Sequence, residues 1–201
     1  MEKAYYLGLD QGTTGETALL LDRDMRVVAR GYHEHRQFFP KPGWVEHVPQ
    51  EILDSLLKAA EQAMRNAGVC WEQIRSIGLA NQGETCLMWD RYTGEPVYPA
   101  IVWQDRRTST AADALAQQHR EDIQQRTGLI VDGYFSATKL QWIMDNVPQV
   151  RERIEKGQLL AGTLDSWLIW KLTGGALQVT DCATASRTML FNIHEKRWDT
   201  V

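Results

Sequence analysis

The chain has 201 residues, a formal net charge of −4, 43% hydrophobic residues and 24% charged residues. This length allows a sizeable core in one large or two small domains, and the composition is typical of a soluble globular protein. The net negative charge and the lack of a basic patch argue against a nucleic-acid binder, and no apolar run approaches the ~20 residues of a membrane helix. Three widely spaced cysteines without a CxxC pair indicate reduced thiols. Because Met1–Lys3 leaves no room for a signal peptide, we expect a cytoplasmic protein.

Two short apolar runs near the N-terminus flank a turn rich in glycine and threonine. The runs are Tyr5–Leu9 and Ala18–Leu21, and their spacing predicts a β-hairpin. Met25–Gly31 alternates enough to be a third strand after a polar turn. Three consecutive antiparallel strands form a meander.

The turn of this hairpin has unusual chemistry. Its polar and glycine positions are Asp10, Gly12, Thr13, Thr14 and Gly15. The two glycines leave backbone N–H groups open to close approach, the threonines add hydroxyl donors, and the aspartate places a carboxylate at the mouth of the turn. Such a set suits a phosphate that carries Mg²⁺. The alternative is a glycine-rich hairpin without a ligand, which is a common structure.

Helices and further strands follow the meander. Phe38–Pro49 contains three prolines and is expected to be an irregular crossing loop. Apolar residues then recur at helical spacing from Glu51 and stop before Gly68. Similar patterns predict strands over Ile74–Ala80, Cys86–Trp89, Ala100–Trp103, Leu159–Thr163 and Arg187–Asn192, and helices over Thr108–His119, Ala137–Asn146 and Trp167–Leu172, the last with Asp165 as its N-cap. The order describes an α/β domain with a mixed sheet, not a Rossmann unit, because GxGxxG is absent.

Several blocks of the sequence together resemble the glycerol kinase branch of the FGGY carbohydrate kinase family. They are LDQGTT at Leu9–Thr14, PKPGWVEHVP at Pro40–Pro49, NQGET at Asn81–Thr85, AIVWQDRRT at Ala100–Thr108, GYFSATK at Gly133–Lys139 and ASRTMLFNIH at Ala185–His194. The resemblance covers essentially the whole chain. It implies an actin-like (ribonuclease H-like) ATPase fold, with an antiparallel N-terminal meander plus parallel strands flanked by helices. It also implies transfer of the γ-phosphoryl of ATP, with Mg²⁺, to a terminal hydroxyl of a polyol or sugar.

The family roles can be carried over by position. The resemblance implies that Asp10 helps to hold Mg²⁺ through water, and that the turn Gly12–Gly15 and position Thr17 meet the nucleotide phosphates. It implies a substrate site made of Gln82, Gly83, Glu84, Trp103 and Tyr134. A carboxylate can accept two hydroxyl hydrogen bonds, an indole offers a flat apolar wall, and a phenol adds a hydroxyl. Taken singly, Trp103 could be a core aromatic and Glu84 a solvated loop acid.

Two positions depart from the family pattern. The family has arginine at position 17, where this chain has Thr17, and glycerol kinases have arginine at position 83, where it has Gly83. Each change removes a donor of charge-assisted hydrogen bonds worth roughly 1.5–3 kcal/mol. Glycine at position 83 also leaves empty volume where a guanidinium stood, so we expect a substrate larger than glycerol, such as a four- or five-carbon polyol or a sugar.

Family members are much longer than this chain. We therefore expect residues 1–201 to be the N-terminal, polyol-binding domain, incomplete at its C-terminal end and inactive alone. The resemblance places the catalytic base and a second, ATP-binding domain beyond Val201, and we expect the full-length protein to be a homo-oligomer. Asp105 and Asp165 have ordinary ion-pair or capping explanations. Two alternatives remain: a degenerate member that binds a small molecule without catalysis, and another actin-like ATPase, against which the predicted polyol residues argue.

Overall fold

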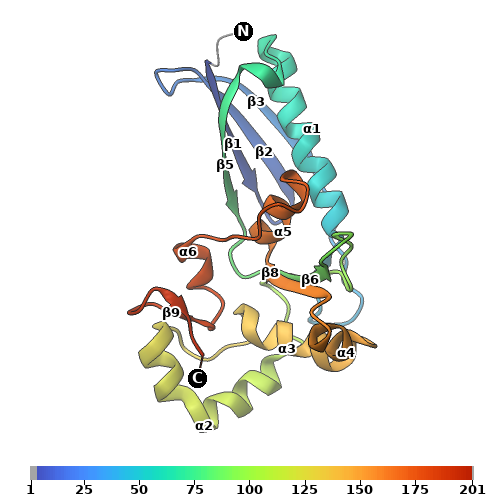
Figure 1. Cartoon of the computed structure of the whole chain (residues 1–201), viewed down its shortest axis with the longest axis vertical. Helices are drawn as coiled ribbons and strands as arrows, with labels where there is room; N and C mark the ends of the chain where they lie inside the picture. The colour runs from blue at the N-terminus through green and yellow to red at the C-terminus, as the bar shows by residue number, and fades with distance from the viewer. Residues whose placement is uncertain (1–3, 201) are drawn as a thin grey trace. The chain divides into compact units, whose positions relative to one another are not determined.

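The computed structural model describes residues 4–200, which divide into two compact units (Figure 1). The first unit runs up to Gln37 and resumes over Val48–Gln82. The second unit comprises Phe38–His47 and continues from Gly83. The predicted phosphate turn thus belongs to the first unit, and Glu84 belongs to the second.

A mixed sheet forms the first unit. Its strands are β1 (Tyr5–Gln11), β2 (Gly15–Leu21), β3 (Val27–Glu34) and β5 (Ile74–Asn81), in the order β3-β2-β1-β5. The first three strands pair antiparallel, and β5 pairs parallel with β1. The predicted hairpin, the meander and the mixed sheet are all confirmed.

Helix α1 (Pro49–Ala67) covers one face of this sheet (Figure 1). Its proline stands in the first turn, where the missing N–H costs no helical hydrogen bond. Gly68 ends the helix in the left-handed conformation (φ 65°), and its N–H donates to the carbonyl of Arg65. Of the apolar side chains in the predicted period, Leu57 is half-buried and the others are buried: Ile52, Leu53, Leu56, Ala60, Ala63 and Met64. A short 3₁₀ turn, Trp71–Gln73, leads into β5.

The second unit contains an antiparallel sheet in the order β4-β7-β6-β8. Its strands are β4 (Glu46–His47), β7 (Ala100–Ile101), β6 (Cys86–Asp90) and β8 (Leu159–Thr163), and β9 (Phe191–Asn192) pairs separately with β10 (Arg197–Trp198). The helices are α2 (Ser109–Thr127), α3 (Ser136–Asn146), α4 (Val150–Glu155), α5 (Leu164–Leu172) and α6 (Cys182–Ala185). One buried cluster joins strands and helices: Met88, Ile101, Ile143, Val150 and Leu159.

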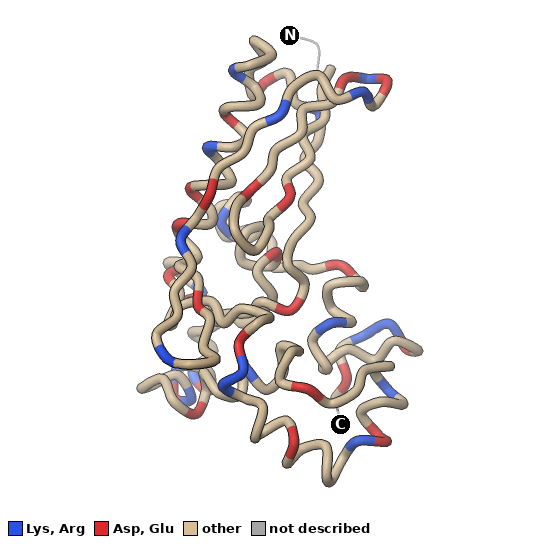
Figure 2. Tube along the Cα trace, turned by 180° about the vertical axis from the view of Figure 1, so that it is seen from behind, with Lys and Arg blue, Asp and Glu red and all other residues tan. Residues whose placement is uncertain are grey.

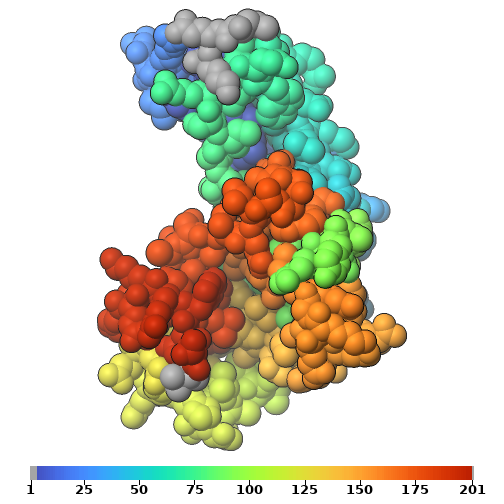
Figure 3. Space-filling view, in the orientation of Figure 1, coloured from blue at the N-terminus to red at the C-terminus, as the bar shows by residue number. Residues whose placement is uncertain are grey.

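The C-terminal segment packs against the end of α2, where red and yellow-green surfaces meet in Figure 3. The N–H of Ile193 donates to the carbonyl of Arg126 at 3.0 Å. The guanidinium of Arg126 also pairs with Asp199 at 3.2 Å. These contacts fix the segment that follows α6 within the second unit.

Several predicted boundaries were wrong. Helix α2 continues past His119 to Thr127, because its polar second half carries an i,i+4 ion pair between Asp122 and Arg126 and ends at the left-handed Gly128. The strand predicted over Arg187–Asn192 is reduced to its last two residues. Asp165 is not an N-cap: Thr163 holds that position, and the Asp165 carboxylate accepts a hydrogen bond from the Thr180 hydroxyl at 2.6 Å.

Three other differences concern short elements. The strand predicted over Ala100–Trp103 covers only Ala100–Ile101. Helices α4 and α6 were not predicted, since both are too short for a periodic pattern.

Acidic and basic residues are interspersed along the backbone of both units, as Figure 2 shows. In the described part of the chain, no helix is long and apolar enough to cross a membrane.

Candidate functional site

The predicted phosphate turn joins β1 to β2. Asp10 lies near the end of β1, is exposed, and stands opposite Thr17 in the antiparallel register. The N–H of Gly12 donates to the carbonyl of Gly15 at 3.2 Å. This amide is therefore engaged inside the turn, which differs from the expectation that it stays open.

Both glycines of the turn are required by close approach. A Cβ on Gly12 would lie 2.7 Å from the Gly15 carbonyl oxygen. A Cβ on Gly15 would lie 2.6 Å from the hydroxyl of Tyr32 on β3. Neither residue has a positive φ, so it is the space around the turn, and not its backbone conformation, that selects glycine.

A buried pair that the sequence analysis did not identify supports the turn. A carboxylate oxygen of Glu16 lies 2.8 Å from Nδ1 of His35, and both side chains are 0% exposed. Burial raises the pKa of Glu16, while His35, Gln11 and the backbone of Gly12 act in the opposite direction. The pair connects β2 to the end of β3 directly behind the turn, so it holds the two strands in register there.

The donor set of the turn is compatible with Mg²⁺ in one limited way. No group of three or more His, Cys, Asp or Glu residues able to hold a metal occurs among residues 4–200. Mg²⁺ commonly keeps several waters and binds through one or two carboxylates together with substrate phosphates. A single exposed carboxylate, Asp10, fits that mode of binding and does not fit an all-protein cage.

Gln82 lies beside the phosphate turn in the first unit. Its backbone N–H donates to the carbonyl of Gln11 at 3.1 Å. Its side-chain amide donates to the carbonyl of Gly12 at 3.5 Å. Gln82 therefore contacts the predicted phosphate turn within the first unit.

The second unit brings three predicted substrate residues together. The rings of Trp103 and Tyr134 meet edge to face with centroids 5.6 Å apart. Burial raises the pKa of Tyr134, and the charge of Glu84 beside it raises it further. The Glu84 side chain is 8% exposed, so neither it nor these half-buried rings behaves as the solvated acid or core aromatic considered above.

Local hydrogen bonds set the positions of these side chains. The backbone N–H of Trp103 donates to the hydroxyl of Thr85 at 3.2 Å, next to Glu84. The hydroxyl of Ser136, at the start of α3, donates to the Glu84 carbonyl at 3.0 Å. Tyr134 is held by its N–H, which donates to Asp132 at 2.7 Å. Three separate segments thus converge on one cluster.

Arg187 belongs to this cluster and was missed by the sequence analysis. Its Nε donates to Oε1 of Glu84 at 2.7 Å. The sequence contains no local signal for it: a buried acid at position 84 needs a cation from elsewhere in the chain, but the burial of Glu84 could not be predicted from the sequence. Which arginine supplies it could not be read from the sequence, because 103 positions separate the two residues.

A buried lysine lies beneath the Tyr134 loop. The side chain of Lys139, on α3, is fully buried, and its ammonium donates to the carbonyls of Tyr134 and Phe135, the latter at 3.3 Å. Burial lowers the pKa of Lys139, and the acidic groups around it, Cys86 foremost, oppose that shift. The lysine fixes the loop that carries Tyr134.

Cys86 provides a test of this packing. It is fully buried, and burial raises the pKa of its thiol to about 12. We expect iodoacetamide at pH 8 to alkylate the exposed Cys182 in the folded chain and to leave Cys86 unmodified, with both modified in urea, as measured by mass spectrometry. Because the unfolded thiol ionises near pH 9, stability from this group should be lost as the pH rises from about 9 towards 12. Equal labelling of Cys86 in buffer and in urea would contradict the packing.

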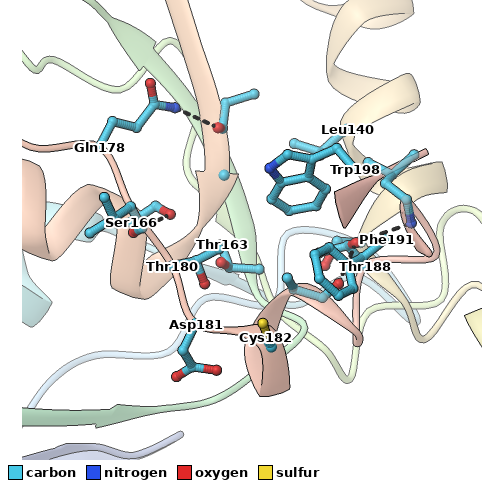
Figure 4. Close-up of a pocket in the computed structure, with 16 residues that line it drawn as sticks. Leu140, Thr163, Ser166, Gln178, Thr180, Asp181, Cys182, Thr188, Phe191 and Trp198 are labelled. Atoms are coloured by element: carbon cyan, nitrogen blue, oxygen red, sulfur yellow. Dashed lines mark hydrogen bonds between the residues drawn. The ribbon is translucent and has the colours of Figure 1, made fainter. Parts of the chain in front are cut away.

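The second unit also contains a hollow of about 630 Å³ (Figure 4). Leu140, Phe191 and Trp198 gather on one side of it, and Ser166 and Thr180 on the other. The hydroxyls of Ser136, Ser166, Thr180 and Thr188 are already bonded within the protein; for example, Ser166 donates to the carbonyl of Val179 at 2.9 Å. None of the predicted site residues lines it, so we assign it no function.

Comparison with models of known protein families shows which class of protein the chain belongs to. Residues 5–201 match the family model described as the FGGY family of carbohydrate kinases, N-terminal domain. The fold and the match define an N-terminal domain of the carbohydrate kinase type.

The curated relatives give the same answer. The chain is 52% identical over 198 residues to a glycerol kinase of Deinococcus radiodurans, covering 98% of this chain and 40% of that protein. It is 53% identical to glycerol kinase 2 of Thermotoga maritima, and the match covers 97% of this chain and 40% of that protein. The chain belongs to the FGGY family of carbohydrate kinases, and it spans about 40% of the length of these relatives.

Solved structures share the fold. A crystal structure of Plasmodium falciparum glycerol kinase with ADP superposes with a TM-score of 0.90 at 35% identity, covering 98% of this chain and 39% of that one. A crystal structure of a xylulose kinase from Rhodospirillum rubrum superposes with a TM-score of 0.83 at 23% identity, and the match covers 97% of this chain and 39% of that one. The expected α/β fold with a mixed sheet is therefore confirmed.

Proposed function

We propose that this chain is the polyol-binding part of an ATP-dependent kinase, which transfers the γ-phosphoryl of ATP to a terminal hydroxyl of a polyol or sugar. The observation that carries the proposal is the convergence of Glu84, Trp103 and Tyr134 in one cluster. An acid beside two half-buried rings suits a carbon chain that bears hydroxyl groups. The glycerol kinases at about half sequence identity support the same reaction class.

The phosphate turn is the proposed contact for the nucleotide. The residues assigned to it are Asp10, Gly12, Thr13, Thr14, Gly15 and Thr17. Because the Gly12 amide is engaged within the turn, we assign the glycines to close backbone approach and the threonines to donation. Asp10 would hold Mg²⁺ through water, and the metal would supply charge neutralisation of the phosphates.

We propose that the acceptor is larger than glycerol. Gly83 has no side chain next to Glu84, and its backbone does not require glycine, since its φ is not positive. A longer polyol could contact the groups around Glu84 with additional hydroxyls. The substrate class is therefore a four- or five-carbon polyol or a sugar.

A binding and turnover series tests this proposal on the 201-residue chain. We expect calorimetry to show tighter binding of erythritol, ribitol or xylulose than of glycerol. Glu84→Gln should weaken that binding at least tenfold, because it removes a charged acceptor, whereas the exposed Glu155→Gln should leave it unchanged. With Mg²⁺ and ATP the chain should form no phosphorylated product, since we place the catalytic base outside it.

Each result of the series has a distinct meaning. Clear preference for glycerol would contradict the larger substrate, and turnover by the purified chain would contradict the missing base. Failure to bind any polyol would overturn the polyol site. The degenerate, non-catalytic alternative rests on Thr17 and Gly83; it would be favoured if the gene's reading frame continues into a second actin-like domain that lacks the catalytic acid.

A further inference from the structure

Arg187 and Glu84 form an ion pair in which the acid is buried and the arginine is partly exposed to solvent. Arg187 follows α6, and its Nε donates to Oε1 of Glu84 at 2.7 Å. The Glu84 side chain is 8% exposed, whereas the Arg187 side chain is 40% exposed. A guanidinium has five N–H donors, and this contact uses one of them. The pair therefore combines a buried acceptor with a donor group that solvent, or a ligand, can reach.

Two aromatic rings hold this guanidinium in place. Its carbon atom Cζ lies 4.9 Å from the ring centre of Phe135 and 5.9 Å from that of Tyr134. Both distances are within the range of cation–π attraction. Tyr134 in turn meets Trp103 edge to face. The cation is thus part of the same cluster as the predicted substrate residues, and it is oriented by them.

Gly83 determines what stands beside Arg187. A Cβ at this position would meet Cγ of Arg187 at 3.4 Å and its Cβ at 3.9 Å, which are ordinary contact distances. Neither crowding nor backbone conformation therefore demands glycine here. Because Gly83 has no side chain, nothing from position 83 lies between its backbone and the aliphatic part of the Arg187 side chain.

We propose that Arg187 is a specificity-determining, substrate-binding residue that selects adjacent hydroxyl groups. This inference rests on the proposed function of the same cluster. A carboxylate only accepts hydrogen bonds and a guanidinium only donates them, whereas a hydroxyl does both. Two neighbouring hydroxyls of one ligand can therefore donate to Glu84 and accept from Arg187 at once. The chemical class selected is a vicinal diol within a polyol chain.

Binding measurements on the 201-residue chain test the role of Arg187. Erythritol and 1,4-butanediol have the same carbon chain and terminal hydroxyls, but only erythritol has adjacent hydroxyls. We expect the wild type to prefer erythritol, and Arg187→Met to weaken erythritol binding about 10- to 100-fold while 1,4-butanediol changes little. Arg187→Lys should fall between, because a lysine lacks the planar fork. Arg151→Met removes an exposed arginine of the same unit and should leave both ligands unchanged.

A second readout does not depend on the folding of any variant. In the wild type, the Nε–H resonance of Arg187 in ¹⁵N-labelled protein should shift on titration with erythritol and stay in place with 1,4-butanediol. A wild type that binds erythritol without this shift, or an Arg187→Met variant with unchanged preference, overturns the role of Arg187 and leaves the polyol site standing. A wild type that binds neither ligand overturns the polyol site itself.

Discussion

Replacing Arg107 by methionine is expected to lower the free energy of unfolding of the second unit by about 3–5 kcal/mol. The Arg107 side chain is fully buried and donates to two carboxylates, Glu46 and Asp105, each at 2.8 Å. Burial alone would lower the pKa of this guanidinium, but the hydrogen bonds to Asp105 and Glu46 raise it. Methionine has similar length but no donors, so it leaves both acids buried without their cation.

The aromatic shell around Arg107 adds to the expected loss. The guanidinium carbon lies 3.7 Å from the ring centre of Trp44 and 4.6 Å from that of Trp142. These cation–π contacts are desolvated, where such attraction is strongest. Asp105 also accepts the backbone N–H of Val45 at 2.6 Å, so the network ties the Phe38–His47 segment to the remainder of the second unit.

Urea unfolding followed by tryptophan fluorescence measures this effect. The matched control is Arg151→Met, because Arg151 forms an exposed ion pair with Asp145 in the same unit, and exposed pairs contribute only about 0–1 kcal/mol. The double variant Arg107→Met with Asp105→Asn should lose less than the sum of the single losses, since one replacement removes the acid that the other leaves unpaired. An Arg107→Met midpoint equal to that of Arg151→Met would show that the buried pair contributes no net stability.

Local patterns were sufficient to predict much of the fold. Helix α1 was predictable because its apolar period lies between Pro49 and Gly68, which act on the backbone directly. The hairpin was predictable because two apolar runs flank a short turn. The end of α2 was not, because an ion pair four residues apart stabilises a polar segment that carries no apolar period.

For the candidate site as well, local features could be predicted from the sequence and long-range contacts could not. Residue types and the family resemblance indicated Glu84, Trp103 and Tyr134, and the structure brings them together. Arg187 depends on a contact between distant segments, as does the buried pair of Glu16 and His35. Such partners follow from tertiary packing, which neither composition nor periodicity encodes.

Replacing Gly31 by alanine is expected to destabilise the first unit by about 3 kcal/mol or more, because it separates α1 from the sheet. A Cβ on Gly31, in β3, would lie 1.9 Å from the carbonyl oxygen of Ala59 and 2.9 Å from the backbone nitrogen of Ala63, both in α1. The obstacle is helix backbone, which cannot change rotamer as a side chain could. To accept one methyl group, the whole helix must move away from the sheet, and its buried apolar face loses contact.

Gly78 is the matched control for this prediction. It lies in β5 of the same sheet, and a Cβ there would meet no atom within 4 Å. Gly78→Ala should therefore leave the free energy of unfolding unchanged or raise it by up to about 1 kcal/mol, since alanine restricts the unfolded chain. Comparing the two variants in urea separates the general effect of a glycine in a strand from the close approach of α1. If both variants unfold at the same urea concentration, α1 is not packed as closely on β3 as the approach of Gly31 to Ala59 indicates.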